Sequence, residues 1–133
     1  MKRSKSKKKK KFSYKVCILA GGGAPKIGQL GEHVQAGVLP VNNKAVISYV
    51  VEKFPANVEI VIAVGHKKES IIDYLKLAHP ERKFTFVAVK KFMGPGSGPG
   101  AGLLESKKHL QCPFILSTAD TILTEDIPTP TYN

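Results

Sequence analysis

The segment Val16–Gly23 reads VCILAGGG, an apolar run that ends in three consecutive glycines. A continuous apolar run is typical of a parallel strand whose two faces are both covered. Glycines directly after such a strand let the chain turn with positive φ and let a ligand approach the backbone closely. The segment therefore predicts a buried strand that presents backbone amides to a phosphate, and a nucleotide is the first ligand to consider. The alternative is a tight turn that binds nothing.

Further apolar runs of strand length alternate with segments of helical spacing along the chain. The strands are expected at residues 15–19, 58–64, 84–89 and 114–117, and the helices at residues 46–54, 71–78 and 102–110. Alternating strands and helices imply a parallel sheet with right-handed crossovers. We therefore expect a three-layer, Rossmann-like, doubly wound α/β fold with strand order 3-2-1-4. Ligands in such sheets bind beyond the carboxyl ends of the strands, here between strands 1 and 4.

Three connections are candidates for the binding site. The glycine loop after Leu19 and the segment after Ser117, which contains Asp120, should face each other at this switch point. The third connection carries GPGSGPG at residues 94–100, where glycines expose amides and prolines stiffen the path; the alternative here is a flexible turn. The long stretch at residues 20–44 is either functional or contains structure that the pattern does not reveal.

Two standard glycine motifs do not fit this chain. The dinucleotide fingerprint G-x-G-x-x-G matches Gly21 and Gly23 but then meets Lys26. The Walker motif G-x-x-x-x-G-K-[ST] matches two glycines but then meets Gln29 and Leu30, so its lysine and hydroxyl are absent. Both sites are excluded as explanations of the glycine run.

The net charge of +11 is concentrated at the start of the chain. Residues 1–11 hold eight of the 21 basic residues and no acid, which leaves 13 basic against 10 acidic residues, or +3, in the remainder. Such a block cannot bury apolar surface, so we expect a disordered polybasic tail at residues 1–12 and an α/β domain at residues 13–133. The tail is either a solvated extension or a site of adhesion to nucleic acid or anionic lipid.

The remaining composition points to a cytoplasmic protein. The basic stretch lacks the pattern of a signal peptide, and no apolar run approaches the roughly 20 residues of a membrane helix. Cys17 and Cys112 both lie in apolar, strand-like segments, and we expect buried, reduced thiols. The four histidines are scattered, which does not suggest a zinc site.

A third pattern fits better than the two standard motifs. The glycine run, then Lys26, then VLPVNNK at residues 38–44 and a helix from about Val46, resembles the amino-terminal, nucleotide-binding half of the sugar-phosphate nucleotidyltransferases. Asp120, in PFILSTAD, matches the family's aspartate at the end of the fourth strand. The segment at residues 94–100 looks like the family's loop that contacts the nucleoside. The resemblance covers residues 15–128, nearly everything outside the tail.

The resemblance implies transfer of a nucleotidyl group from a nucleoside triphosphate to a sugar phosphate or a similar small phospho-acceptor, with release of pyrophosphate. The products would be precursors of surface polysaccharides. It also implies that Asp120 holds Mg²⁺ and that Lys26 takes the place of the arginine that steadies the departing pyrophosphate. The nucleotide-binding residues that it implies are Leu19, Ala20, Gly21, Gly22, Gly23, Gly94, Gly96, Ser97 and Gly98.

The chain also departs from the family pattern. Ala24 and Pro25 replace a glycine and a Thr/Ser, and Gln35-Ala36 replace a Pro-Lys pair whose lysine contacts the α-phosphate. We therefore expect weakened or abolished activity. The chain stops at Asn133, where family members continue, so we expect an incomplete domain with an exposed sheet edge that forms a homo-oligomer or binds a completing chain.

Two functions of other classes remain open at this point. One is a catalytically inactive nucleotide-binding or regulatory module, and the other is a protein that binds polyanions through its lysine tail. Neither the nucleobase nor the acceptor follows from the sequence.

Overall fold

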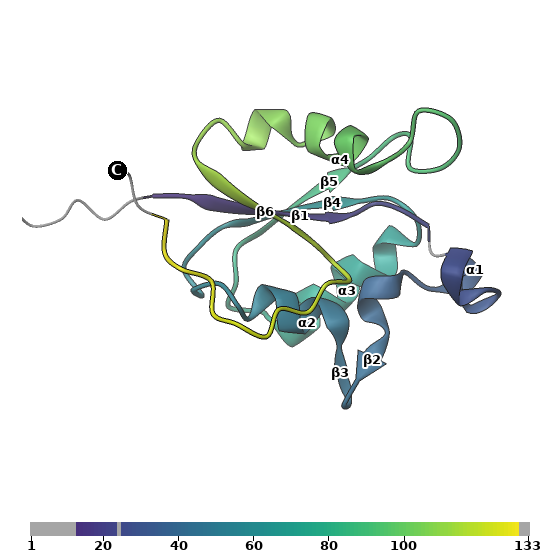
Figure 1. The fold of residues 1–133 in the computed structure, drawn as a ribbon, viewed down its shortest axis with the longest axis horizontal. Helices are drawn as coiled ribbons and strands as arrows, with labels where there is room; N and C mark the ends of the chain where they lie inside the picture. Colours follow the sequence, from purple (N-terminus) through teal and green to yellow (C-terminus); the bar gives the residue numbers. More distant parts are fainter. Residues whose placement is uncertain (1–12, 24, 131–133) are drawn as a thin grey trace, which may run out of the picture.

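The computed structural model describes residues 13–130 with two exceptions. Ala24 is not described, and Lys26 is described by its backbone but not by its side chain. Four parallel strands form the central sheet: β1 (Lys15–Ala20), β4 (Ile60–Val64), β5 (Phe84–Ala88) and β6 (Phe114–Thr118). Their order is β5-β4-β1-β6, which is the predicted 3-2-1-4 order (Figure 1). The predicted tail at residues 1–12 lies outside the described residues, and its binding to polyanions stays a prediction.

Helices cover both faces of the sheet. The helices α2 (Val46–Val51) and α3 (Lys68–Ala78) lie on one face. The opposite face carries α4 (Pro99–Glu105), followed by the short 3₁₀ turn η3 (Lys107–His109) (Figure 1). The expected three-layer, doubly wound α/β fold is therefore confirmed.

The core has two parts, one on each face of the sheet. Strand β4 is buried along its whole length, as a central parallel strand with helices on both sides should be. On the α2–α3 side, Ile18 and Ile62 pack with Ile71 and Leu75 of α3. On the α4 side, a smaller cluster joins Cys17, Val61, Val87 and Leu110. Because successive strand residues alternate between the faces, β1 contributes to both clusters.

Two of the predicted helices have different limits in the structure. Helix α2 ends at Val51, although Phe54 beyond it is buried as expected. The third helix begins at Pro99 instead of residue 102, because proline suits the first turn of a helix. It ends at Glu105, and Leu104, expected on its apolar face, is 70% exposed.

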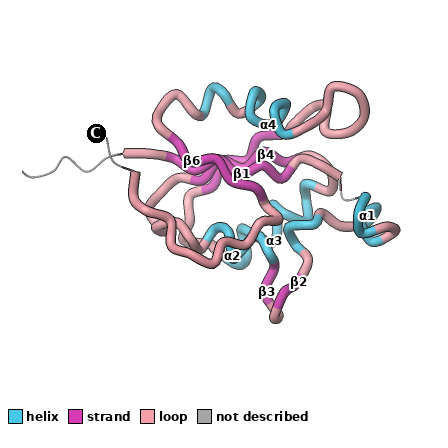
Figure 2. Tube along the Cα trace, viewed as in Figure 1, coloured by secondary structure: helices cyan, strands magenta, loops and turns pink. Residues whose placement is uncertain are grey.

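The long stretch at residues 20–44 contains structure that its sequence pattern does not show (Figure 2). It forms the short 3₁₀ turns η1 (Pro25–Ile27) and η2 (Ala36–Val38), the short helix α1 (Leu30–His33), and a hairpin of β2 (Pro40–Val41) and β3 (Lys44–Ala45). Asn42 and Asn43, at the tip of the hairpin, have φ angles of 49° and 62°. Two positive φ angles are what a two-residue type I′ turn requires, and asparagine tolerates them.

The two thiols differ in their surroundings. Both cysteines are free, and Cys17 is buried in β1 as predicted. Cys112 is only partly buried and lies in the bend before β6, so its assignment to a strand was wrong. The strand itself begins two residues later, at Phe114. Among the described helices, none is long and apolar enough to cross a membrane.

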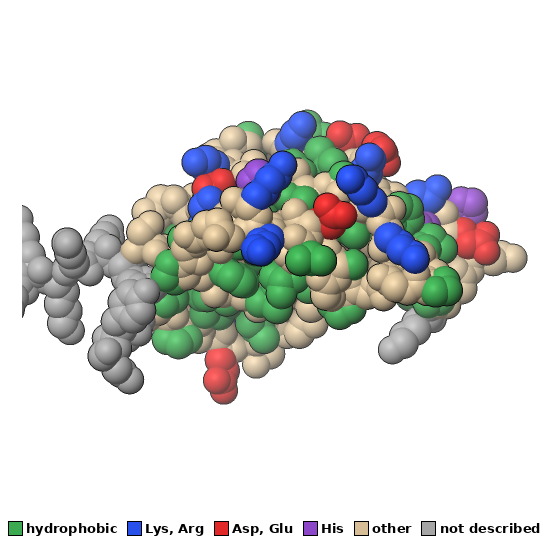
Figure 3. All heavy atoms as spheres, turned by 90° about the horizontal axis from the view of Figure 1, so that it is seen from above, with side chains coloured by type: hydrophobic (Ala, Val, Ile, Leu, Met, Phe, Trp, Pro, Cys, Tyr) green, Lys and Arg blue, Asp and Glu red, His purple; other side chains and the backbone are tan. Residues whose placement is uncertain are grey.

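Among the described residues, strand β6 lies at one edge of the sheet and pairs with β1 alone. Phe114 and Leu116 of this strand are 39% and 49% exposed. They share the face of the sheet on which α4 lies, because they align with Lys15 and Cys17 of β1. Figure 3 views the molecule from that side and shows apolar side chains gathered towards one margin, with lysines spread over the rest.

Candidate nucleotide-binding site

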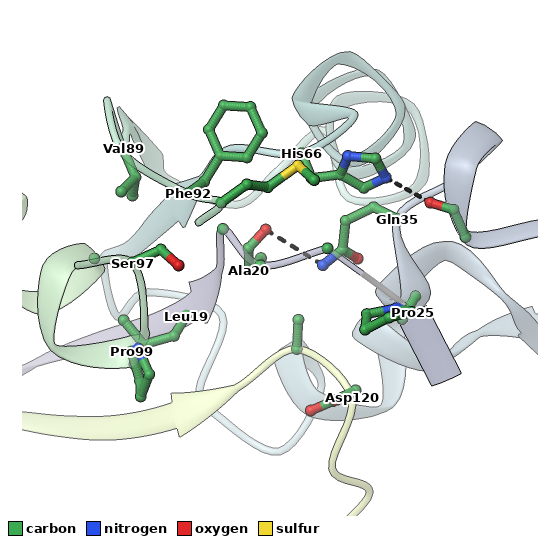
Figure 4. Close-up of a pocket in the computed structure, with 18 of the residues that line it drawn as sticks. Leu19, Ala20, Pro25, Gln35, His66, Val89, Phe92, Ser97, Pro99 and Asp120 are labelled. Carbon is green, nitrogen blue, oxygen red and sulfur yellow. Dashed lines mark hydrogen bonds between the residues drawn. The ribbon is translucent and has the colours of Figure 1, made fainter. Parts of the chain in front are cut away.

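A cavity of about 860 Å³ opens at the carboxyl ends of the strands (Figure 4). Five stretches of chain line it: the end of β1 with the glycine run, parts of residues 25–36, Ala63 and His66 at the end of β4, parts of residues 89–102, and residues 118–120. The cavity therefore lies where the sequence predicts a ligand, at the switch point of the sheet.

The ends of β1 and β6 bring two predicted site segments together. The backbone N–H of Ala119 donates a hydrogen bond of 3.1 Å to the carbonyl of Leu19. Asp120 follows directly, with its carboxylate exposed, and lines the same cavity as Leu19 and Ala20 (Figure 4). The expectation that these two loops face each other is confirmed.

The glycine run has a different backbone from the one expected. Positive φ angles among the described glycines occur at Gly28, Gly94, Gly96 and Gly98, and not at residues 21–23. The expected positive φ in the run is therefore wrong: the chain bends at Gly22 without entering the left-handed region. At Gly22 and Gly23, however, no heavy atom lies within 4 Å of where a Cβ would stand. These two glycines leave open, exposed backbone along the cavity.

Gly65, which the sequence analysis did not single out, fixes the position of this backbone. A Cβ at this residue would lie 2.5 Å from the carbonyl oxygen of Gly21 and 2.6 Å from Cβ of Phe92. Real contacts are never so short, so the ends of β1, β4 and β5 meet here only because residue 65 is glycine. The available signal was the same as in β1: an apolar strand, IVIAV, followed directly by glycine.

Gln35 is a second residue with a role that the sequence did not reveal. Its buried side chain donates from Nε2 to the carbonyl of Ala20 (3.3 Å) and accepts at Oε1 from the N–H of Gly37 (2.5 Å). It thereby fastens η2 to the end of β1. Ala36, between these two contacts, becomes part of the cavity wall.

The predicted glycine loop after β5 forms the wall opposite the residue 25–36 segment. Gly94, Ser97 and Gly98 line the cavity, and Ser97 Oγ donates to the carbonyl of Gly94 (2.6 Å). The φ angles of Gly94 and Gly96, 79° and 81°, favour glycine at both positions. Gly96 is not among the residues that line the cavity and packs beside the end of the Lys91 side chain.

Comparison with known proteins shows which nucleotide-binding proteins the chain resembles. No protein-family model matches the chain. The bifunctional protein GlmU of Methanococcus vannielii is 28% identical over 111 residues, and that of Methanocaldococcus jannaschii is 29% identical over 111 residues. The structure of CTP:phosphocholine cytidylyltransferase from Streptococcus pneumoniae is 26% identical, with a TM-score of 0.65 over 87% of this chain. The chain therefore resembles a sugar-nucleotidyltransferase domain.

A further solved structure has the same fold as this chain. UDP-glucose pyrophosphorylase complexed with UDP-glucose matches 89% of the chain with a TM-score of 0.69, at 20% identity. The alignments cover 83% of this chain but only 25% and 26% of the two GlmU proteins. The structural alignments cover 50% of the UDP-glucose pyrophosphorylase chain and 49% of the cytidylyltransferase chain.

Among the described residues, the charged side chains that line the cavity are those of Glu32 and Asp120. Lys26 has its backbone in η1, beside the wall, but its side chain lies outside the description. Among the described residues, no group of three or more His, Cys, Asp or Glu side chains could hold a metal by itself. One or two carboxylates do fit Mg²⁺, which fills its remaining positions with phosphate oxygens and water.

The shifted pKa values among the described residues belong to groups away from the cavity. Burial raises the pKa of the Cys17 thiol and lowers the pKa of His79. The pKa of Glu59 is lowered, chiefly by the hydrogen bond that its carboxylate accepts from Thr85. None of these three residues lines the cavity, so their shifts concern stability and not the candidate site.

Proposed function

We propose that the domain binds a nucleoside triphosphate in the cavity and transfers its nucleotidyl group to a sugar phosphate or a similar small phospho-acceptor, with release of pyrophosphate. The observation that carries the proposal is the meeting of open glycine backbone, at Gly22 and Gly23, with the Asp120 carboxylate in one cavity. The names of its relatives agree with this chemistry, since they include a pyrophosphorylase for UDP-glucose and a cytidylyltransferase for phosphocholine.

In this reaction a phosphate oxygen of the acceptor attacks the α-phosphorus of the nucleotide and expels pyrophosphate. The protein has mainly to position the two reactants and to neutralise charge. In our proposal the backbone of Gly22 and Gly23 receives the phosphates, and the loop with Gly94, Ser97 and Gly98 contacts the nucleoside. These two segments lie on different walls of the cavity, which leaves the space between them for the ligand.

Asp120 would hold Mg²⁺, which when bound neutralises the phosphates of the nucleotide. Its carboxylate is exposed in the cavity directly after β6, where one side of the ion could remain open to phosphate oxygens and water. Lys26 is proposed, from the family resemblance, as the cation for the pyrophosphate.

We further propose that transfer is slow. Ala36 lies in the wall of the cavity, held there by Gln35 on one side, and its methyl group cannot contact a phosphate as a lysine does. Lys26 is a point charge without the bidentate grip of arginine. The same observation favours the second candidate function, a nucleotide-binding module that performs no transfer.

Pyrophosphate release separates the two functions. The protein is incubated with each of ATP, CTP, GTP, UTP and dTTP, with Mg²⁺ and a panel of sugar and choline phosphates, and nucleotide binding is measured in parallel by calorimetry. Binding together with pyrophosphate release that needs an acceptor supports the transferase. Binding without release supports the inactive module. Absence of binding by all five nucleotides overturns both.

A further inference from the structure

One residue, His66, holds both ends of the segment that follows β1. Its backbone N–H donates a hydrogen bond of 3.0 Å to the carbonyl of Gly21. Its ring Nε2 lies 2.5 Å from the carbonyl of Gly31, at the other end of the segment (Figure 4). Because a carbonyl can only accept, Nε2 must carry the proton in this contact. The two bonds close residues 21–31 into a loop fastened to the carboxyl end of β4.

The short helix α1 depends on this contact for its attachment. Gly31 is the buried residue of α1, whereas Leu30, Glu32 and His33 are exposed. A four-residue helix has almost no stability of its own, since isolated helices need far more residues to form. The carbonyl of Gly31 therefore gives α1 a fixed point on the sheet.

His66 is itself firmly placed. It follows Gly65, which has no room for a side chain between Gly21 and Phe92. The His66 ring lies with its centre 6.5 Å from the centre of the Phe92 ring, in a tilted arrangement. The residue after next, Lys68, begins α3. The hydrogen bond from this firmly placed side chain therefore holds the loop against the end of β4.

We propose that His66 is a positioning residue that sets the wall of the nucleotide cavity by tethering residues 21–31. That cavity is lined by Gly21 at the start of the loop, by Glu32 just after its end and by several residues between them. His66 lines it too. Loss of the Nε2–H contact releases α1 and loosens this wall while the sheet and its core stay intact. The tether stands on the geometry alone; its effect on nucleotide affinity rests on the proposed function.

Three variants test the tether. His66→Phe keeps an aromatic ring against Phe92 and removes the donor, and His66→Gln keeps an N–H donor at similar reach. His33→Phe is the matched control, because His33 is exposed on the same helix and does not line the cavity. Amide hydrogen exchange of residues 22–33 is followed by mass spectrometry in the full chain without nucleotide, and thermal unfolding confirms that each variant folds.

We expect exchange in residues 22–33 to become about tenfold faster in His66→Phe, the size of one lost hydrogen bond, with little change in β1 and β4. His66→Gln should restore most of the protection, and His33→Phe should match the wild type. In calorimetry with Mg²⁺ and the nucleotide that binds best, the dissociation constant of His66→Phe should rise by a similar factor, and His66→Gln should recover it.

Unchanged exchange in a folded His66→Phe protein overturns the tether. So does a His66→Gln protein as unprotected as His66→Phe, since the contact would then not depend on a donor. Faster exchange without weaker nucleotide binding overturns the role in setting the cavity wall. If the wild-type protein binds none of the nucleotides, the proposed function fails, while the exchange measurement still decides whether His66 holds the loop.

Discussion

At the scale of single residues, the candidate site combines side chains that we propose face the ligand with residues that hold the cavity wall in place. Asp120 and Ala36 lie in the cavity wall and belong to the first kind. Gly65 and Gln35 belong to the second, because they join segments that are distant in the sequence. Residues of the first kind can be tested by changing one functional group at a time.

Ala36→Lys should increase pyrophosphate release if the wall residue lies opposite the phosphates. A charge-assisted contact contributes about 1.5–3 kcal/mol, so we expect a gain of roughly tenfold to a hundredfold in the rate with the best nucleotide and acceptor. Ala56→Lys is the control, since Ala56 is exposed in a turn and does not line the cavity. An equal rate in the two variants would show that residue 36 does not face the reacting phosphates.

Asp120→Asn should remove the Mg²⁺-dependent part of nucleotide affinity, because the amide cannot supply a negative oxygen to the ion. Calorimetric titrations with and without Mg²⁺ measure that part directly. Asp126→Asn provides the control: Asp126 is an exposed carboxylate a few residues further along, and it does not line the cavity. Full Mg²⁺ dependence in Asp120→Asn would exclude Asp120 as the ligand.

At the scale of the elements, the predictable parts are those whose pattern is local. Strands β1 and β4 have continuous apolar runs because both of their faces are covered, and the right-handed crossover rule then gives the order of the four strands. The elements η1, α1 and η2 were not predictable, since each is three or four residues long and none has an apolar period. Contacts from Gln35 and His66 hold them, and a sequence pattern does not show such contacts.

The same reasoning explains the partial success at the candidate site. Leu19 and Ala20 end β1 and Asp120 comes shortly after β6, so the topology alone brings them together. The glycine run was located correctly, but none of its residues has the positive φ that was expected, because a glycine permits that conformation without requiring it. The roles predicted for Lys26, Asp120 and the glycines stay predictions until they are measured.

The packing of α2 against α3 predicts a loss of stability in mild acid. Ser48 Oγ of α2 lies 2.8 Å from His79 Nε2 and 2.6 Å from the Tyr74 hydroxyl of α3. Burial lowers the pKa of His79 below its usual 6.5, against a smaller opposing effect of Glu52. The folded state thus favours the neutral ring, so this stabilisation is complete above pH 6.5 and declines as the pH falls through the lowered pKa.

Urea unfolding between pH 7.5 and 5 checks this expectation. The free energy of unfolding of the wild type should decrease below pH 6.5, and His79→Gln, which cannot titrate there, should show a flatter profile at lower overall stability. His33→Gln is the matched control because His33 is exposed. Parallel profiles for the wild type and His79→Gln would assign the acid sensitivity to other groups.

At the scale of the whole molecule, the sheet is closed by helices above and below but open at β6. The segment at residues 113–119, PFILSTA, carries no charge, and two of its apolar side chains, Phe114 and Leu116, are partly exposed. Within residues 13–130, as far as the structure describes them, the backbone of β6 pairs with β1 on one side and with no strand on the other. Sheets usually protect such an edge with charges, prolines or bulges, because a bare strand pairs with other chains. We therefore expect concentration-dependent association through β6.

Leu116→Lys places a charge in the middle of that edge and should shift the protein towards the monomer in sedimentation velocity, over a concentration range in which the wild type associates. Leu77→Lys is the control, because Leu77 is 83% exposed on α3, on the other face of the sheet. Leu116 does not line the nucleotide cavity, so nucleotide affinity should be the same in both variants. A wild type that remains monomeric, or association that Leu77→Lys reduces as much as Leu116→Lys, would show that β6 is not the contact, and the apolar residues of this edge would then require another explanation.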